Sequence, residues 1–359
     1  MSHDIPPQTP ASPAIAWSDA VRADQFTRWL TGIAAQHGLQ PDSLRLASAD
    51  ASFRRYFRIE AQDGSRIIMD APPDKENSAP FVKVAALMQA AGVHGPQVLA
   101  WDEPLGFMLL TDLGAQTMMQ VINRDDPQAN LPLYLQAVDA LIAWQLSSQP
   151  GVLPPYDDAL LRRELALFPD WYISRHKGVV IDDAMRQTLD KSFEEIIRQN
   201  LRWPSVFVHR DFMPRNLMVS GPGALGVLDF QDAVYGPITY DIASLMRDAF
   251  LSWDEDFCLD ITIRYWEKAR KAGLPVGDDF GEFYRGVEWM GLQRHLKVAG
   301  IFARLTLRDG KPQYLADTPR FITYIRTTCE RYRELKPLLR LVEKIEGIEM
   351  PNVFGFGRQ

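Results

Sequence analysis

VFVHRDFMPRNLMV, residues 206–219, places a charged loop between two apolar runs. Apolar flanks are typical of buried strands, and burying a carboxylate is unfavourable unless it is paired. We therefore expect Asp211 and Asn216 to lie on a polar loop that two core strands hold in place. A third apolar run, GVLDF at 226–230, folds back as a hairpin and brings Asp229, 13 residues after Asn216, to the same end.

These three side chains suit the transfer of a phosphoryl group. Mg²⁺ prefers oxygen ligands, and Asn216 and Asp229 supply an amide oxygen and a carboxylate. The carboxylate of Asp211 can then orient an attacking hydroxyl. The alternative is that Asp211 and Asn216 only satisfy the backbone of a turn, as Asx residues often do.

The composition excludes several classes of protein. The chain has 359 residues, and 46 acidic against 39 basic residues give a net charge of −7, which argues against a general nucleic-acid binder. Cys258 and Cys329 form neither a disulfide framework nor a zinc pattern, as is typical of a reducing compartment. No apolar stretch approaches the roughly 20 residues of a membrane helix. We therefore expect a cytoplasmic protein with no membrane or nucleic-acid partner.

The first third of the chain is rich in strand signals. Residues 1–24, with many Pro, Ser and Ala residues in their first part, are predicted to be a disordered tail. Residues 25–114 then form an N-lobe in which Asp63-Gly64 marks a hairpin turn and 80–91 form the main helix. The predicted strands are 56–60, 66–70, 97–102 and 107–112.

Beyond Gly114 the apolar periodicity is mostly helical, and 206–230 is the one strand-like interruption. Residues 115–359 are therefore expected to form a larger helical C-lobe that carries the charged hairpin. The two parts together predict an α+β, bilobal fold. The predicted helices of the C-lobe are 131–148, 157–168, 182–199, 239–250, 256–272, 279–304, 318–332 and 335–346.

The order of the motifs resembles that of the protein-kinase-like superfamily, and within it the aminoglycoside phosphotransferases. HRDFMPRN (209–216) matches the H-x-D-x-x-x-x-N catalytic loop, and LDFQDA (228–233) follows with a metal-binding Asp. GPITYDIASL (236–245) resembles the next segment of that family. The resemblance implies a protein-kinase-like fold and an enzyme that transfers phosphate from ATP.

The resemblance also implies roles for single residues. It implies that Asp211 is the catalytic residue and that Asn216 and Asp229 bind nucleotide and Mg²⁺. It also implies that His209 and Asp241 support the loop. The connector FMLLTDLGAQ (107–116) is expected to hydrogen-bond adenine around Thr111 and Leu113. An ordinary edge strand and turn is the alternative for this connector.

Three features of protein kinases are missing. The loop that covers the phosphates is normally rich in glycine, but ASADASFRRY (47–56) has none. We expect Ser52 and Arg54 to contact phosphate instead, with a solvent-facing strand arginine as the alternative for Arg54. The lysine usual two residues after the catalytic Asp is Met213 here, and Arg215 is a possible source of that charge.

The third departure concerns the strand lysine that contacts the phosphates. RIIMD (66–70) ends in Met69 and Asp70, whereas the following helix carries Lys83. One hypothesis is a reversed ion pair between Asp70 and Lys83. An unpaired surface lysine is the alternative. These departures argue against a protein kinase.

A further resemblance is carried by five stretches, which are SFRRYFRI, MDAPPDKEN, RRELALFPDWY, QRHLKVAGIFARL and RDGKPQYL. In these stretches the chain resembles bacterial anomeric amino-sugar kinases, which phosphorylate N-acetylmuramate and N-acetylglucosamine at C1 in cell-wall recycling. This resemblance implies ATP and Mg²⁺ as cofactors, a small sugar as substrate and no obligate protein partner. Rival interpretations are a kinase of an aminoglycoside, a choline-like alcohol or homoserine, and a non-catalytic nucleotide-binding relative.

Candidate substrate residues come from the helix at 279–304. Arg294, Lys297 and Arg304 recur at helical spacing on one side, which suits an anionic substrate such as a sugar with a lactyl carboxylate. A solvated face or a charge network with neighbouring acids is the alternative. Trp171 is a candidate for stacking on a sugar ring, although such residues more often line the core.

Overall fold

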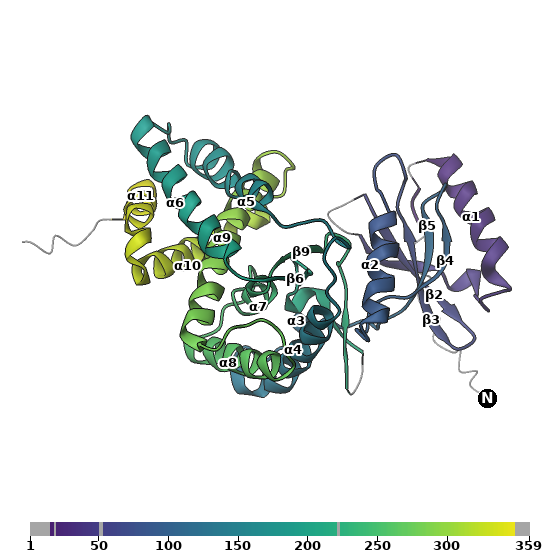
Figure 1. The fold of residues 1–359 in the computed structure, drawn as a ribbon. Coiled ribbons are helices and arrows are strands. Elements are labelled where there is room, and N and C mark those ends of the chain that lie inside the picture. The colour runs from purple at the N-terminus through teal and green to yellow at the C-terminus, as the bar shows by residue number, and fades with distance from the viewer. Residues whose placement is uncertain (1–14, 18, 50–52, 221–222, 349–359) are drawn as a thin grey trace, which may run out of the picture.

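The computed structural model describes residues 15–17, 19–49, 53–220 and 223–348. They form two lobes joined at one side, a smaller lobe built on a sheet and a larger helical one (Figure 1). The α+β bilobal prediction is confirmed. No helix in these ranges is long and apolar enough to cross a membrane.

The N-lobe is a five-stranded antiparallel sheet with one helix on each face (Figure 1). Alternating side chains divide its core: Ile68 and Leu109 pack towards α1, while Met69 and Leu110 pack towards α2. The strands, in spatial order, are β1 (Arg45–Ala49), β2 (Arg55–Ala61), β3 (Gly64–Asp70), β5 (Phe107–Thr111) and β4 (Val98–Asp102). The helices are α1 (Ala20–Ala34), α2 (Ala79–Ala90) and the short 3₁₀ turn Pro41–Ser43. The strands and the helix predicted for this lobe are therefore confirmed.

The predicted tail requires a correction. Helix α1 begins at Ala20, where Asp19 caps it by accepting a hydrogen bond from the Val21 amide at 2.8 Å. Trp17 packs on Phe26 with ring centroids 5.0 Å apart. The described part of 15–24 is thus ordered, because the half-buried Trp17 packs on Phe26 of α1 and Phe57 of the sheet, while residues 1–14 and 18 lie outside the described residues.

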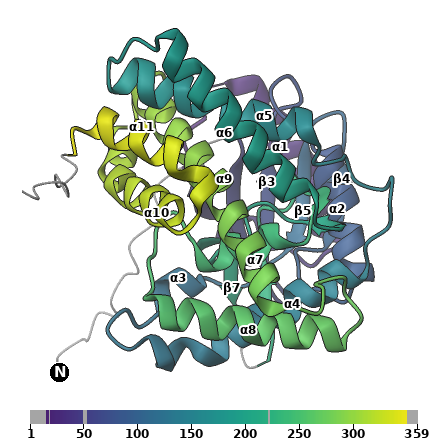
Figure 2. The same ribbon diagram turned by 60° about the vertical axis from the view of Figure 1, so that its left-hand side comes forward.

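The C-lobe is a set of helices around α9 (Phe280–Leu307), which runs through its middle (Figure 2). At Gly300 the chain before the π-helix approaches so closely that an added Cβ would lie 2.3 Å from the Leu167 carbonyl oxygen. The other helices are α3 (Met118–Val121), α4 (Leu131–Leu146), α5 (Asp158–Leu165), α6 (Asp183–Leu201), α7 (Thr239–Met246), α8 (Glu255–Lys271), α10 (Thr318–Arg331) and α11 (Lys336–Glu346). The π-helix is Phe168–His176, and the 3₁₀ turns are Pro127–Asn130, Pro214–Asn216, Pro312–Asp317 and Arg333–Leu335.

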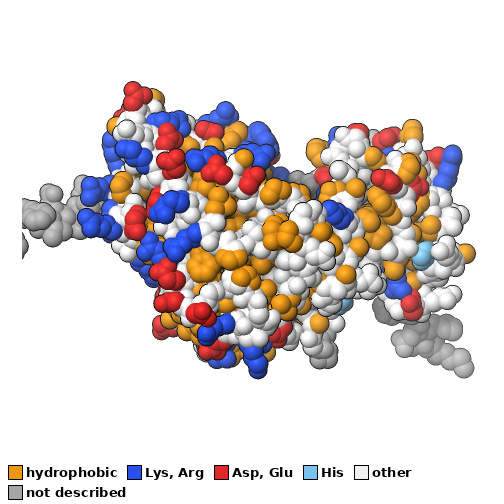
Figure 3. Space-filling model, in the orientation of Figure 1, with side chains coloured by type: hydrophobic (Ala, Val, Ile, Leu, Met, Phe, Trp, Pro, Cys, Tyr) orange, Lys and Arg blue, Asp and Glu red, His pale blue; other side chains and the backbone are white. Residues whose placement is uncertain are grey.

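All eight predicted helices of the C-lobe are present, but its strands pair differently from the expectation. β7 (Leu217–Val219) and β8 (Leu225–Val227) form the predicted hairpin. β6 (Ser205–Val208) instead pairs with β9 (Val234–Pro237), a strand that the sequence analysis did not predict. The charged loop therefore connects two separate two-stranded sheets. Over the face of the C-lobe in Figure 3, acidic and basic side chains are interspersed.

The hypothesis of a reversed Asp70–Lys83 pair is wrong. Asp70 is fully buried and faces α1, where Arg22 and Arg55 bind its two oxygens at 2.6 and 2.5 Å. Lys83 donates instead to the carbonyl of Val152 in the C-lobe. Strand alternation explains the difference, because Met69 and not Asp70 faces α2.

We predict that Asp70→Ala lowers the free energy of unfolding by on the order of 3 kcal/mol, because two arginines lose the carboxylate that neutralises them. Lys83→Ala, the matched control on the face towards the C-lobe, should change it by less than about 1 kcal/mol. Urea unfolding of both variants measures the difference. Equal losses in the two variants would contradict this assignment of the ion pair.

Candidate active site

A cavity of about 450 Å³ lies between the lobes. Ile67 and Leu110 line it from the N-lobe, and Met218 and Leu228 line it from the C-lobe. Polar groups from the loop and hairpin, including Asn216, Asp229 and Gln231, also line the cavity. A cavity with apolar and polar parts suits a ligand with a flat apolar ring and an anionic group.

The connector forms one end of this cavity, and both Thr111 and Leu113 line it. Arg58 holds the connector by binding Asp112 at 2.5 and 3.0 Å and the Gly114 carbonyl at 2.7 Å. The pKa of Asp112 is lowered, because hydrogen bonds from Arg58 and Ser65 outweigh the opposing effect of burial. The residues expected to contact adenine therefore stand on a backbone that ion pairing fixes.

The charged loop is held by the carboxylate of Asp241 at the start of α7. Its oxygens accept the backbone N–H groups of His209 at 2.7 Å and Arg210 at 3.0 Å. Burial raises the pKa of Asp241 to about 7, against the effect of these two amides and of Arg294. Arg210 itself has φ 78°, a left-handed conformation that is unfavourable for a residue with a side chain.

The side chain of His209 joins the loop to the hairpin. Nε2 lies 3.0 Å from the Leu228 carbonyl oxygen, and the Asp211 amide donates to Nδ1 at 3.3 Å. Burial lowers the pKa of His209 to about 4, so the imidazole is neutral near pH 7. A neutral ring with Nε2 protonated satisfies both contacts.

Asp211 is the acidic residue of the charged loop and directly follows Arg210. Burial alone would raise the pKa of its carboxyl, but the charges of Lys297, Arg294 and Arg210 outweigh burial and hold the pKa below its ordinary value. No group in the described part of the chain donates a hydrogen bond to this carboxylate. Asp211 is therefore an ionised acceptor that a hydroxyl can reach.

Asn216 connects Asp211 to Asp229. Its Nδ2 donates to the Asp211 carbonyl oxygen at 2.9 Å and to the Asp229 carboxylate at 3.2 Å. Gln231 donates to the other Asp229 oxygen at 2.8 Å, and Asp229 has φ 63°. The predicted proximity of the three residues is thus confirmed.

The donor set fits Mg²⁺. Asn216 and Asp229 offer a hard amide oxygen and a carboxylate, and in phosphate-transferring sites Mg²⁺ uses one or two carboxylates together with substrate phosphates. The described residues contain no cluster of three or more His, Cys, Asp or Glu side chains, so they build no all-protein cage there. These two residues would hold the ion only together with a phosphate ligand.

The basic helix face differs from the expectation. Arg294 and Lys297 are buried, with 3% and 8% exposure, and Arg294 reaches the charged loop. Arg294 donates to the Arg210 carbonyl at 2.6 Å, and Lys297 pairs with Glu164 at 3.2 Å. Arg304 lies ten residues further, about 15 Å along α9, so the three cations do not form one open surface.

The remaining candidates contact other residues or lie outside the described residues. Trp171 is half-buried beneath Arg175, whose guanidinium is 4.1 Å from the ring centre. Arg54 pairs with Glu76 at 3.1 Å in the N-lobe. Ser52 lies outside the described residues.

The sequence analysis did not single out Glu164 and Tyr156. Glu164 is buried and binds Arg210 at 2.6 Å and the Tyr156 hydroxyl at 2.5 Å. Burial opposes its charge, but Lys297 and Arg210 hold the pKa of Glu164 below its ordinary value. The sequence analysis considered a charge network with neighbouring acids as an alternative for Arg294, Lys297 and Arg304. That alternative did not identify Glu164 as the acid.

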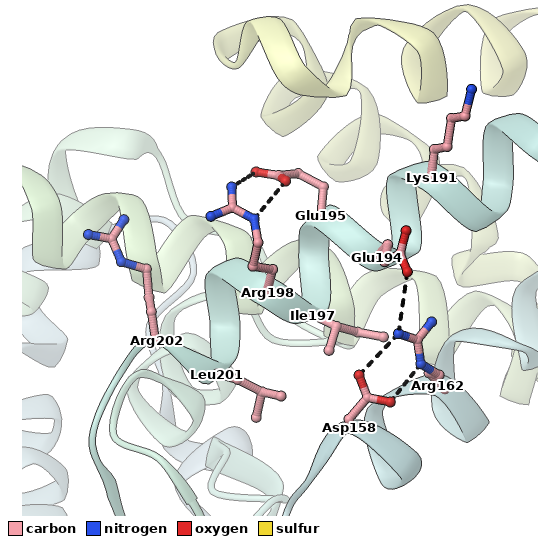
Figure 4. A pocket seen from close by; sticks show the side chains of 9 residues that line it. All are labelled: Asp158, Arg162, Lys191, Glu194, Glu195, Ile197, Arg198, Leu201 and Arg202. Atoms are coloured by element: carbon pink, nitrogen blue, oxygen red, sulfur yellow. Dashed lines mark hydrogen bonds and ion pairs between the residues drawn. The ribbon is translucent and has the colours of Figure 1, made fainter.

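A larger hollow, of about 640 Å³, lies between α5 and α6 (Figure 4). Four of its charged groups pair with each other, Arg162 with Asp158 at 2.6 Å and Arg198 with Glu195 at 2.5 Å. The hollow therefore lacks the converging polar groups of the interlobe cavity.

Comparison with known proteins places the chain in a class. The model of the phosphotransferase enzyme family (APH) matches residues 43–279, and the chain belongs to this family.

The chain is also similar to solved structures of the same fold. One is an ethanolamine kinase of Plasmodium vivax, with TM-score 0.61, 10% identity and coverage of 88% of this chain and 91% of that one. A choline/ethanolamine kinase family protein of Mesorhizobium loti gives TM-score 0.60 at 15% identity over 90% and 99%. The protein-kinase-like fold is therefore confirmed.

Curated relatives are much more similar in sequence. An N-acetylmuramate/N-acetylglucosamine kinase of Pseudomonas aeruginosa is 49% identical over 91% of this chain and 98% of its own length. The protein of the same name from Neisseria meningitidis is 50% identical over 85% and 91%. The similarity thus extends well beyond the motifs of the active site.

Asp248, just after α7, gives a pH prediction. Burial raises the pKa of Asp248 to about 6, and its Oδ2 finds no hydrogen-bond partner in the described structure. The carboxyl group of Asp248 therefore stays protonated up to about pH 6 in the folded chain, whereas in the unfolded chain it loses its proton near pH 4. The stability contributed by the protonated group is present at pH 4 and is lost as the pH rises to 6.

Asp248→Asn removes this titration. We expect the free energy of unfolding of the variant, relative to the unsubstituted chain, to increase by up to about 3 kcal/mol between pH 4 and pH 6.5 and then to stay constant. Urea unfolding at several pH values measures the change. A difference that does not vary with pH would show that the folded chain does not raise this pKa.

Proposed function

We propose that this chain is an ATP-dependent kinase that phosphorylates the anomeric hydroxyl of N-acetylmuramate and N-acetylglucosamine. The observation that carries the proposal is the bridge that Asn216 makes between Asp211 and Asp229 beside the interlobe cavity. Relatives named for these two sugars, at about half identity over nearly their whole length, support the choice of substrate.

ATP would lie between the lobes, with its adenine between Ile67 and Met218 and against the connector at Thr111 and Leu113. The triphosphate would then point towards Asp229. When bound by Asn216 and Asp229, Mg²⁺ supplies positive charge that neutralises the phosphate oxygens. The protein's own contribution is to fix the two side chains through the hydrogen bonds of Asn216 and Gln231.

The acceptor hydroxyl would approach the carboxylate of Asp211. Asp211 accepts a hydrogen bond from the hydroxyl, orients its oxygen towards the terminal phosphate and receives the proton late in the transfer. An anomeric hydroxyl is more acidic than an ordinary alcohol, so a carboxylate with a lowered pKa suffices as its partner. Lys297 and Arg294 keep Asp211 ionised and thus available for this role.

The substrate class is tested by measuring ATP consumption with N-acetylmuramate, N-acetylglucosamine, an aminoglycoside, choline and homoserine. We expect turnover with the two amino sugars, and a product whose phosphorus NMR signal is split by the anomeric proton. Turnover with one of the other alcohols alone would replace the sugar assignment. ATP binding without turnover of any acceptor would favour a non-catalytic relative.

Asp211→Asn should lower kcat by roughly 10²–10⁴-fold while the fold and ATP binding persist, since the amide cannot accept the proton. The matched control is Asp232→Asn, which alters an exposed carboxylate in the same segment and should leave kcat within about twofold. Steady-state kinetics with either sugar, and thermal unfolding, provide the measurement. A folded Asp211→Asn enzyme with near-normal kcat would exclude Asp211 as the base.

A further inference from the structure

Two positively charged residues of the described chain line the interlobe cavity, Arg58 and Arg215. Arg58 is fixed at the connector, where it binds the Asp112 carboxylate and the Gly114 carbonyl. Arg215 belongs to the charged loop and directly precedes Asn216. A triphosphate whose adenine lies at the connector would therefore find the charge of Arg215, and not that of Arg58, beside the proposed metal ligands.

The other elements around the site offer no further cation to the cavity among the described residues. Strand β3 ends in Met69, which is fully buried against α2. Arg294 and Lys297 of α9 are buried and bind the Arg210 carbonyl and Glu164. Arg215 is therefore the cation that the fold leaves for an anionic ligand at this side of the cavity.

No acid neutralises the guanidinium of Arg215. Within the described residues its side chain forms no hydrogen bond and no ion pair, and the residue is exposed. The guanidinium carbon lies 4.6 Å from the centre of the Phe250 ring. An aromatic ring attracts a cation through its π face, so this contact holds the group without an acceptor atom. The N–H groups of Arg215 thus remain free to donate to phosphate oxygens.

The ring that holds Arg215 is itself fixed. The Phe250 amide donates to the Asp248 carboxylate at 3.0 Å, and the Phe250 ring packs on Phe302 of α9 with centroids 5.7 Å apart. The backbone of Arg215 stands in the 3₁₀ turn that the buried Pro214 begins. Both ends of the Arg215 side chain are therefore positioned before a ligand binds.

The loop places Arg215 where the transferred phosphate must lie. Asn216 donates to the Asp211 carbonyl at 2.9 Å and to the Asp229 carboxylate at 3.2 Å, so the proposed base and the metal ligands meet around one short loop. In phosphoryl transfer the terminal phosphate lies between the attacking hydroxyl and the metal ion. Arg215 stands on the same loop, between Asp211 and Asn216 in the chain, and faces the cavity.

We infer that Arg215 binds the terminal phosphate of ATP and that Phe250 positions its guanidinium. The planar fork of the guanidinium suits two oxygens of one phosphate group. The inference rests on the proposed use of ATP but not on the identity of the sugar.

The test compares two nucleotides that differ only in the terminal phosphate. The Kd values of ATP and ADP are measured by calorimetry, with Mg²⁺ and without sugar, for the unsubstituted chain, Arg215→Met, Arg215→Lys and Phe250→Leu. Arg215→Met should weaken ATP binding about ten- to a hundredfold and change ADP binding by less than about twofold, since ADP lacks the contacted phosphate. Arg215→Lys should retain part of the ATP affinity because it keeps the charge. Phe250→Leu should show the same selectivity with a smaller loss.

Arg270→Met is the matched control. Arg270 is an exposed arginine of α8 that also lies over an aromatic ring, 5.3 Å from the centre of Trp266, and it pairs with Asp278 at 2.8 Å. It does not line the interlobe cavity. This variant should bind both nucleotides normally, and thermal unfolding of every variant checks that the fold persists.

Two results would overturn the inference. One is unchanged ATP affinity in a folded Arg215→Met variant, and the other is an equal loss for ATP and ADP, which would mean that Arg215 only supports the loop. A chain that shows the predicted selectivity but phosphorylates no amino sugar would reject the proposed substrate and leave this inference standing. Failure of the unsubstituted chain to bind ATP would reject both.

Discussion

The hydrogen bonds from the backbone of His209 and Arg210 to Asp241 are the interaction on which the active site depends. They hold Arg210 in a left-handed backbone conformation, which is unfavourable for a residue with a side chain. This conformation sets the direction of the chain between the end of strand β6 and Asp211. A buried carboxylate accepts two amides more strongly than any neutral group would. The two hydrogen bonds to the buried carboxylate of Asp241 thus offset the unfavourable backbone conformation of Arg210.

The charges around this loop form one cooperative cluster. Arg210 joins Glu164 through its side chain and Arg294 through its carbonyl, while Lys297 links Glu164 to the field around Asp211. Burying any one of these groups alone would be unfavourable by several kcal/mol, but together they satisfy one another. The cluster leaves Asp211 as the acid with an accessible carboxylate, which is the electrostatic state that a proton acceptor requires.

The sequence predicted those parts of the molecule that depend on local pattern. Helical periodicity identified the helices of the C-lobe, and the motif around Asp211 and Asn216 predicted the proximity of Asp229. Pairings between distant segments were not predictable in this way. The partner of Asp70 was missed because Arg22 lies in a segment that composition marked as a tail. β9 was missed because its sequence, VYGP, contains a glycine and a proline, which are typical of turns. The burial of Lys297 depends on Glu164 and that of Arg294 on the Arg210 carbonyl, and spacing within α9 carries no information about either partner.

The central helix α9 also constrains how this chain can change in evolution. Arg294 meets the Arg210 carbonyl, Lys297 meets Glu164, and Gly300 admits the Leu167 carbonyl, all from one continuous helix. A single inserted or deleted residue before Arg294 would rotate everything beyond it by about 100° and shift it by about 1.5 Å. All three contacts would then be lost together, although no side chain had been replaced. This helix can therefore accept substitutions one at a time, but its length between the cap at Asp279 and Gly300 is fixed by the loop it supports.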